Sequence, residues 1–143
     1  MISPHLDRLA DALTELRYAG PLYARQLPLT VRNESNLRSR WATRERAAEQ
    51  RQVVGMALGN AMREFGLRRE NVRLAVRLLR LYSGRGQAMD DDGLARAFKA
   101  VRDGVADALA IDDRNPRVVW VPDQQRSDVT AVRIEFYRLK ETP

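Results

Sequence analysis

Cysteine is absent from this chain of 143 residues, and histidine occurs once, as His5. The absence of thiols excludes disulfides and thiolate metal ligands. A single histidine near the N-terminus excludes zinc sites built from several histidines and disfavours Ser-His or Cys-His catalysis. The remaining candidates for a metal site are therefore carboxylates.

Long apolar runs are also absent. No run approaches the roughly 20 residues that a membrane span needs. The N-terminus lacks the basic-then-apolar pattern of a secretion signal. We therefore expect a soluble, cytoplasmic protein without a membrane partner, and the length suits one ordinary domain.

Positive charge dominates the sequence but is unevenly distributed. The formal net charge is +6. Residues 21–86 carry 14 Arg and 5 Glu, whereas residues 87–113 carry 3 basic and 7 acidic side chains. The basic part is typical of a surface that binds a polyanion such as nucleic acid. The alternative is compositional, because 23 of the 25 basic residues are arginine, as a GC-rich genome would produce.

The spacing of apolar residues predicts both strands and helices. Helical spacing over residues 5–17 predicts an N-terminal accessory helix within residues 1–20. Period-two alternation and short apolar runs predict four strands, and a period of three to four residues predicts two main helices. The strands are expected at 27–32, 72–78, 118–121 and 129–139, and the main helices at 41–65 and 92–110. This order predicts an α+β (α/β-type) fold, a single domain over residues 21–143 with a small mixed β-sheet packed by the two main helices.

Five aspartates bracket the second main helix: Asp90, Asp91 and Asp92 before it, and Asp112 and Asp113 after it. Asp90 and Asp92 are two residues apart, so in an extended segment their side chains point to the same side. A sheet layout can bring Asp112 or Asp113 back beside them. Mg²⁺ prefers oxygen ligands and retains several waters, so two or three carboxylates suffice. Such a site would polarise a scissile phosphate and lower the pKa of an attacking water.

The same aspartates also have a purely structural interpretation. Aspartate before a helix is an ordinary cap, and acidic residues in the first turn favour the helix dipole. The segment from Asp112 to Pro116 has the composition of a turn. A calcium loop beginning at Asp90 is excluded, because its twelfth position is Val101 rather than glutamate.

Arginines gather in and before the first main helix, and another lies in the turn of residues 83–86. We predict that these side chains contact the DNA backbone, although a solvated helix face is an equally ordinary role for them. The predicted DNA-binding residues are Arg38, Arg40, Arg44, Arg46, Arg51 and Arg85.

At the acidic segments the chain resembles the RusA family of phage-type Holliday junction resolvases, which are crossover junction endodeoxyribonucleases. Members carry a D-x-D-N segment that opens a helix, a lysine one or two turns later, and a D-D pair after the helix. The corresponding segments here are 90–94, 98–103 and 111–113. Earlier in the chain, a stretch followed by a basic helix resembles the family's N-terminal half, and it contains Pro28, Asn33, Asn36 and Trp41. The resemblance covers about residues 25–140.

The resemblance implies a Mg²⁺-dependent, structure-specific endonuclease, with Mn²⁺ as a substitute ion. Its substrate would be the four-way DNA junction, resolved by paired phosphodiester hydrolysis in recombination and repair. Asp90, Asp92 and Asp113 match the metal ligands, Asp112 is a further ligand, and Lys99 matches the active-site lysine. The family also implies a homodimer and a phage or prophage origin, and a two-fold substrate suits a two-fold enzyme.

Two positions depart from the family's pattern. Gly93 stands where asparagine is usual, and Lys99 lies seven residues after Asp92, about one turn late. Arg96 has the usual four-residue spacing, so either cation can serve. Two other interpretations stay open. One is a non-catalytic DNA-binding protein with a degenerate metal site, and the other is a small structural or interaction protein.

Overall fold

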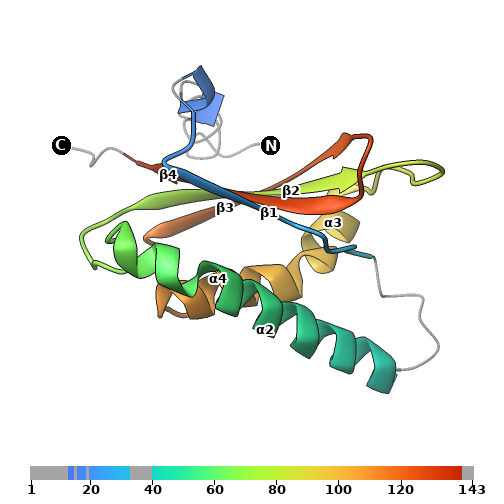
Figure 1. Ribbon diagram of the computed structural model, residues 1–143, viewed down its shortest axis with the longest axis horizontal. Coiled ribbons are helices and arrows are strands. Elements are labelled where there is room, and N and C mark those ends of the chain that lie inside the picture. The colour runs from blue at the N-terminus through green and yellow to red at the C-terminus, as the bar shows by residue number, and fades with distance from the viewer. Residues whose placement is uncertain (1–12, 15, 19, 33–39, 140–143) are drawn as a thin grey trace.

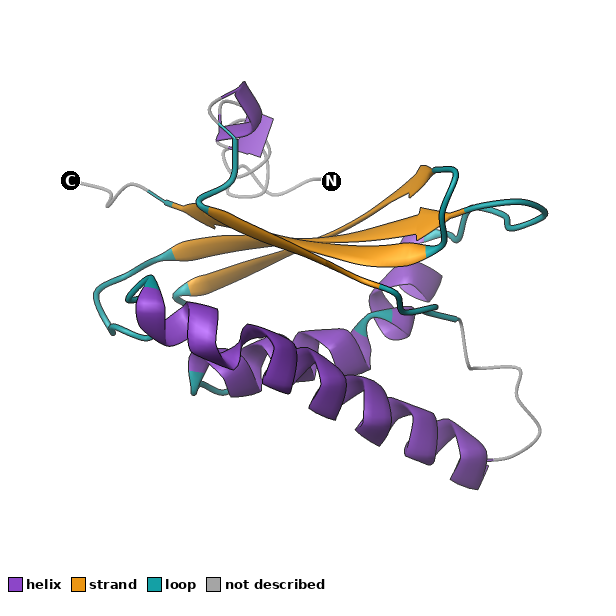
Figure 2. Cartoon of the chain, in the orientation of Figure 1, coloured by secondary structure: helices purple, strands orange, loops and turns teal. Residues whose placement is uncertain are grey.

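A mixed four-stranded sheet with helices on one face forms the body of the protein in the computed structural model (Figures 1 and 2). The structure describes residues 13, 14, 16–18, 20–32 and 40–139. The elements are β1 (Tyr23–Leu27), α2 (Arg40–Glu64), β2 (Leu74–Tyr82), α3 (Asp91–Ala97), α4 (Lys99–Leu109), β3 (Val118–Arg126) and β4 (Ala131–Arg138). The strand order is β1-β4-β2-β3, with β4 antiparallel to both neighbours and β2 parallel to β3. The predicted α+β class with a small mixed sheet is confirmed.

Alternation along the strands separates the two faces of the sheet. On β2, Leu74, Val76 and Leu78 belong to the main core, whereas Ala75 belongs to a second apolar cluster. Side chains of α2 and α4 complete the main core, because both helices present an apolar stripe to the sheet. These side chains include Val54, Leu58, Met62, Val101, Val105 and Leu109.

The first predicted strand is wrong in position. It was expected at 27–32, but β1 spans Tyr23–Leu27 and pairs antiparallel with β4, from Tyr23 opposite Phe136 to Leu27 opposite Val132. Pro28 has no backbone N–H to continue the ladder, so the strand ends before it. The last two strands were placed better, although β3 extends five residues beyond Val121 and β4 begins at Ala131 rather than Val129.

The second predicted main helix is interrupted. Residues 92–110 were expected to form one helix, but α3 ends at Ala97 and α4 begins at Lys99. Phe98 lies between them with φ −86° and ψ −1°, and its side chain is buried in the main core. The break between α3 and α4 lies at this buried ring, and the spacing of apolar residues alone does not reveal it.

Residues 13, 14 and 16–18 lie over the opposite face of the sheet from α2 and α4 (Figure 1). Leu13 packs with Ala75 and Tyr137 there. Residues 13, 14 and 16–18 are helical, as predicted, and the rest of the predicted helix lies outside the described residues. The predicted end of the first main helix is also confirmed, because Gly66 adopts φ +67° just after α2.

α2 and α4 approach closely at Gly104. A Cβ atom at this position would lie 2.6 Å from the carbonyl oxygen of Arg51 and 2.7 Å from the Cβ of Val54. Both distances are shorter than real contacts, so a side chain at Gly104 requires the helices to separate.

Gly104→Ala is therefore expected to lower the free energy of unfolding by about 1–3 kcal/mol, despite the better helix propensity of alanine. Gly59→Ala in α2 is the matched control, because a Cβ there meets nothing within 4 Å. The control should stabilise the protein by about 0.5–1 kcal/mol through helix propensity. Urea denaturation measures both values, and equal stabilisation by the two substitutions would contradict the close helix contact.

Candidate functional site

The first acidic segment is a helix start anchored to β3. The Asp90 side chain caps α3, because its Oδ1 accepts a hydrogen bond from the Gly93 amide at 2.7 Å. Just before it, the backbone of Met89 exchanges two hydrogen bonds with the Gln124 side chain, at 2.9 and 2.6 Å. Asp92 is exposed in the first turn of α3 and does not cap it. Within the described part of the chain its carboxylate has no hydrogen-bond or ion-pair partner.

The second acidic segment is held in place through its backbone. The carbonyl oxygen of Asp113 accepts hydrogen bonds from Trp120 Nε1 at 3.0 Å and from Arg102 Nη2 at 3.1 Å. The Arg102 guanidinium also lies over the Trp120 ring, 5.2 Å from its centroid. Asp112 Oδ1 accepts from the Arg114 amide at 2.9 Å, which is the turn geometry expected from composition. The Asp113 carboxylate is thus presented by a fixed turn.

Lys99 joins the start of α4 to this turn. Its Nζ lies 3.0 Å from Asp103 Oδ1 and 3.3 Å from Asp113 Oδ2. The hydrogen bond to Asp103 is the main cause of a raised Lys99 pKa, which burial partly offsets and Asp113 increases. The Lys99 ammonium in turn lowers the pKa of the Asp113 carboxyl, with a smaller contribution from Arg102 at 3.6 Å. Asp113 is therefore an ionised carboxylate already in contact with a cation.

The structure leaves the two acidic segments apart. Gln124 anchors the first and Trp120 the second, and these residues are four positions apart on β3, or about 13 Å at about 3.3 Å per residue. Over the described residues, no three His, Asp or Glu side chains are grouped so that they could hold one metal ion. Asp112 and Asp113 are brought together with Lys99, whereas Asp90 and Asp92 lie at the far end of α3.

Two adjoining hollows lie where α2 meets α3 and α4. They have volumes of about 330 and 340 Å³ and share Arg51, Lys99 and Asp103. The hollow of about 340 Å³ is lined by Asp112 and Asp113. The other contains Arg96, so the two cations predicted for the active site lie beside the same space.

The predicted DNA-binding arginines differ in whether their charge is exposed or already paired with a carboxylate. Arg51 makes a bidentate ion pair with Asp107, at 2.7 and 2.9 Å, and this hydrogen-bonded pairing raises the pKa of Arg51. Arg44 is exposed on α2, and Arg85 is exposed in the turn after β2. Arg38 lies outside the described residues, as does the Arg40 side chain.

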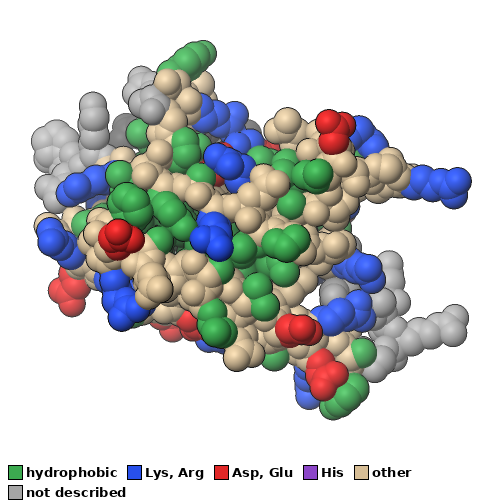
Figure 3. Space-filling model, in the orientation of Figure 1, with side chains coloured by type: hydrophobic (Ala, Val, Ile, Leu, Met, Phe, Trp, Pro, Cys, Tyr) green, Lys and Arg blue, Asp and Glu red, His purple; other side chains and the backbone are tan. Residues whose placement is uncertain are grey.

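Arg46 is partly buried and has an interaction partner. Arg126 holds the turn that carries Arg85 by donating to the carbonyl oxygens of Gly84 and Gly86, both at 2.9 Å. Lys and Arg side chains lie at both ends of the face shown in Figure 3 and also between them, interspersed with apolar and acidic side chains. The positive charge on this face is therefore not confined to α2.

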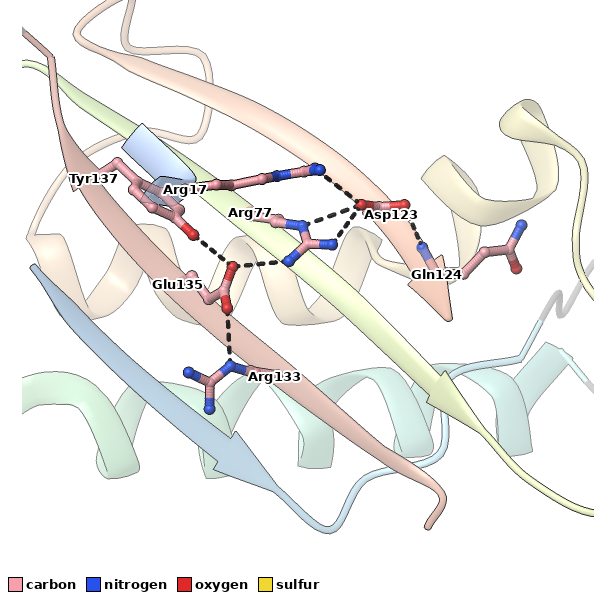
Figure 4. Close-up of polar contacts among 7 residues, drawn as sticks. All are labelled: Arg17, Arg77, Asp123, Gln124, Arg133, Glu135 and Tyr137. Carbon is pink, nitrogen blue, oxygen red and sulfur yellow. Dashed lines mark hydrogen bonds and ion pairs between the residues drawn. The ribbon is translucent and has the colours of Figure 1, made fainter. Parts of the chain in front are cut away.

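A polar network on the opposite face of the sheet was missed by the sequence analysis (Figure 4). Glu135 accepts hydrogen bonds from Arg77 at 3.0 Å, Arg133 at 2.8 Å and Tyr137 at 2.8 Å. Arg77 also donates to Asp123 at 2.7 Å. The signal was available, because the predicted strand alternation places these charged residues on the face opposite the apolar ones.

Burial and hydrogen bonding compete within this network. Burial by itself would raise the pKa of Glu135, but hydrogen bonds from Arg133, Tyr137 and Arg77 lower it. Burial and the Glu135 carboxylate raise the pKa of Tyr137 to about 12. The network therefore holds a carboxylate ionised and a phenol neutral at the centre of the sheet.

Comparisons of the chain with known protein families, with curated proteins and with solved structures find no match. None of the helices in the described part of the chain is long and apolar enough to cross a membrane.

Proposed function

We propose that the protein is a Mg²⁺-dependent, structure-specific endodeoxyribonuclease that resolves four-way DNA junctions. The observation that carries this proposal is the 3.3 Å contact between Lys99 and Asp113. Lys99 follows the acidic segment that opens α3, and Asp113 belongs to the second acidic pair. The resemblance to RusA-type resolvases implies an active-site lysine close to the second acidic pair, and the contact between Lys99 and Asp113 supports that arrangement.

The carboxylates suit a magnesium ion shared with DNA. Mg²⁺ is commonly held by one or two carboxylates together with waters and substrate phosphates, so it does not require three protein ligands. Asp90 and Asp92 would hold an ion at the first acidic segment, and Asp113, with Asp112 as a further ligand, would hold one at the second, because the two segments lie too far apart to share a single ion. Asp92 and Asp112 are exposed, and Asp90 has a second carboxylate oxygen besides its capping one. Bound Mg²⁺ would polarise the scissile phosphate and acidify an attacking water.

The side chains around the carboxylates have separate roles in this proposal. Lys99 stabilises the negative charge that develops on the phosphate, with Arg96 beside the same space. Arg102 and Trp120 position Asp113 through its backbone carbonyl. Exposed arginines, including Arg44 and Arg85, bind the DNA backbone.

Paired cuts in a two-fold junction favour a homodimer with two identical sites. A DNA substrate also suits a cytoplasmic protein of phage or prophage origin.

Calorimetric titration with Mg²⁺ tests the metal site. The nuclease proposal expects a binding heat in the wild-type protein mixed with a four-way junction, and loss of that heat in Asp92→Asn. The second candidate is a non-catalytic DNA-binding protein, motivated by Gly93 and by the separation of the two acidic segments. It expects junction binding that weakens steeply with salt, with no Mg²⁺ or Mn²⁺ heat in either protein.

A further inference from the structure

The hollow of about 330 Å³ is lined by small apolar side chains and by cations. Four alanines line it, two from α2 and two from the α3–α4 region, and we call them its floor: Ala47, Ala48, Ala97 and Ala100. Four cations line it, and we call them its rim: Arg32, Arg51, Arg96 and Lys99. The volume falls at the lower end of the range typical of small-molecule sites.

The rim cations fall into two pairs. Arg51 and Lys99 are neutralised locally by Asp107, Asp103 and Asp113. Arg32 and Arg96 are exposed and have no hydrogen-bond or ion-pair partner in the described parts of the chain. Among the described residues, Asp103 is the one carboxylate that lines the hollow, and it is already bound by Lys99. The hollow therefore offers two free guanidinium groups beside an apolar surface.

We propose that this hollow takes one unstacked nucleotide of the bound DNA. The phosphate lies between Arg32 and Arg96, because guanidinium groups match phosphate geometry. The base packs against the alanine floor, where the small side chains leave room for a flat ring. An unpaired or junction nucleotide suits the hollow better than a paired one, since it leaves the stack at lower cost. This inference rests on the proposed DNA substrate and does not depend on cleavage.

Fluorescence anisotropy in EDTA tests the proposal without cleavage, using a labelled single-stranded oligonucleotide as the probe. Ala48→Leu fills the hollow without changing charge, and leucine is well tolerated on an exposed helix position. We expect it to weaken binding about fivefold or more, which is the size of one lost base contact. Arg32→Ala and Arg96→Ala should each weaken binding more than Arg63→Ala, a control near the other end of α2.

Two further binding measurements identify what occupies the hollow. An oligonucleotide of abasic sites should bind wild type and Ala48→Leu equally, because no base enters the hollow. The mononucleotide dAMP should compete only at much higher concentration than the oligonucleotide. Competition at equal concentration would assign the hollow to a free nucleotide and overturn the proposal.

The proposal is also overturned if wild type does not bind the oligonucleotide, or if Ala48→Leu binds like wild type. It is likewise overturned if Ala48→Leu weakens binding of the abasic probe as much as that of the intact one, or if the two rim arginines behave like Arg63. A protein that binds as expected but never cuts DNA would instead remove the proposed nuclease function alone.

Discussion

Asp92→Asn is expected to lower Mg²⁺-dependent cleavage of a four-way junction at least about 100-fold, because one charged ligand of the metal site is lost. The substitution preserves size and removes only the negative charge. Asp92 is exposed and unpaired in the described structure, so stability should change by less than about 0.5 kcal/mol. Gel assays with labelled junctions measure the rate, and metal-free anisotropy shows whether junction affinity is retained.

Asp91→Asn is the matched control for this experiment. Asp91 is the neighbouring exposed acid of the same helix turn, and no role in metal binding is assigned to it. Its substitution changes the net charge by the same amount and should leave cleavage within about twofold of wild type. If Asp91→Asn and Asp92→Asn reduce the rate equally, Asp92 acts only through the general charge of the segment and is not a ligand.

Glu135→Ala is expected to destabilise the protein by about 3 kcal/mol, the lower end of the cost of breaking a buried ion pair. The Glu135 side chain is 8% exposed, and its removal leaves Arg77, 14% exposed, with Asp123 as its one charged partner among the described residues. Tyr137 and Arg133 lose an acceptor at the same time. Urea denaturation at neutral pH measures the change in unfolding free energy.

Arg133→Ala provides the comparison. Its side chain is 37% exposed and makes one ion pair with Glu135, so its loss should cost less than about 1 kcal/mol. A cost for Glu135→Ala no larger than that for Arg133→Ala would contradict the central position of Glu135 in the network.

The same network sets the pH range of stability. The pKa of Glu135 is lowered on folding, so its contribution is complete above pH 4.5 and is lost as the pH falls through the folded pKa. The pKa of Tyr137 is raised from 10.0 to about 12, so its contribution is complete below pH 10.0 and is lost as the pH rises toward about 12. Denaturation across pH should show both losses in wild type and a weaker acid loss in Glu135→Ala. Parallel acid profiles for the two proteins would rule out this role for Glu135.

Periodicity in the sequence was enough to predict the class of fold and most of its elements. Alternation between apolar and polar residues predicted β4 and part of β2, which spans Leu74–Tyr82 rather than 72–78. The glycine after α2 located the end of that helix. The position of β1 could not be predicted in this way, because Leu27 is the one buried residue of this edge strand and the register of β1 is set by pairing with β4. The break at Phe98 likewise depends on tertiary packing of one ring.

Charge counting was less informative about the candidate site. It predicted a surface for polyanions over residues 21–86, yet Arg77 within this range is largely buried, as is Arg117 beyond it. Arg117 donates to backbone carbonyl oxygens of the segment that joins α2 to β2, including those of Leu67 and Arg69. The position of Lys99 between the two acidic segments was visible in the sequence. The anchoring of Asp113 by Trp120 depends on how the turn packs against β3, which spacing does not encode.

The most direct test of the nuclease proposal is incubation of the wild-type protein with a four-way junction labelled on each strand in turn. The proposal predicts paired, symmetric nicks in two opposing strands with Mg²⁺ present, and no cleavage with EDTA or of a linear duplex of the same sequence. A junction that is bound but stays intact in Mg²⁺ and in Mn²⁺ would contradict it.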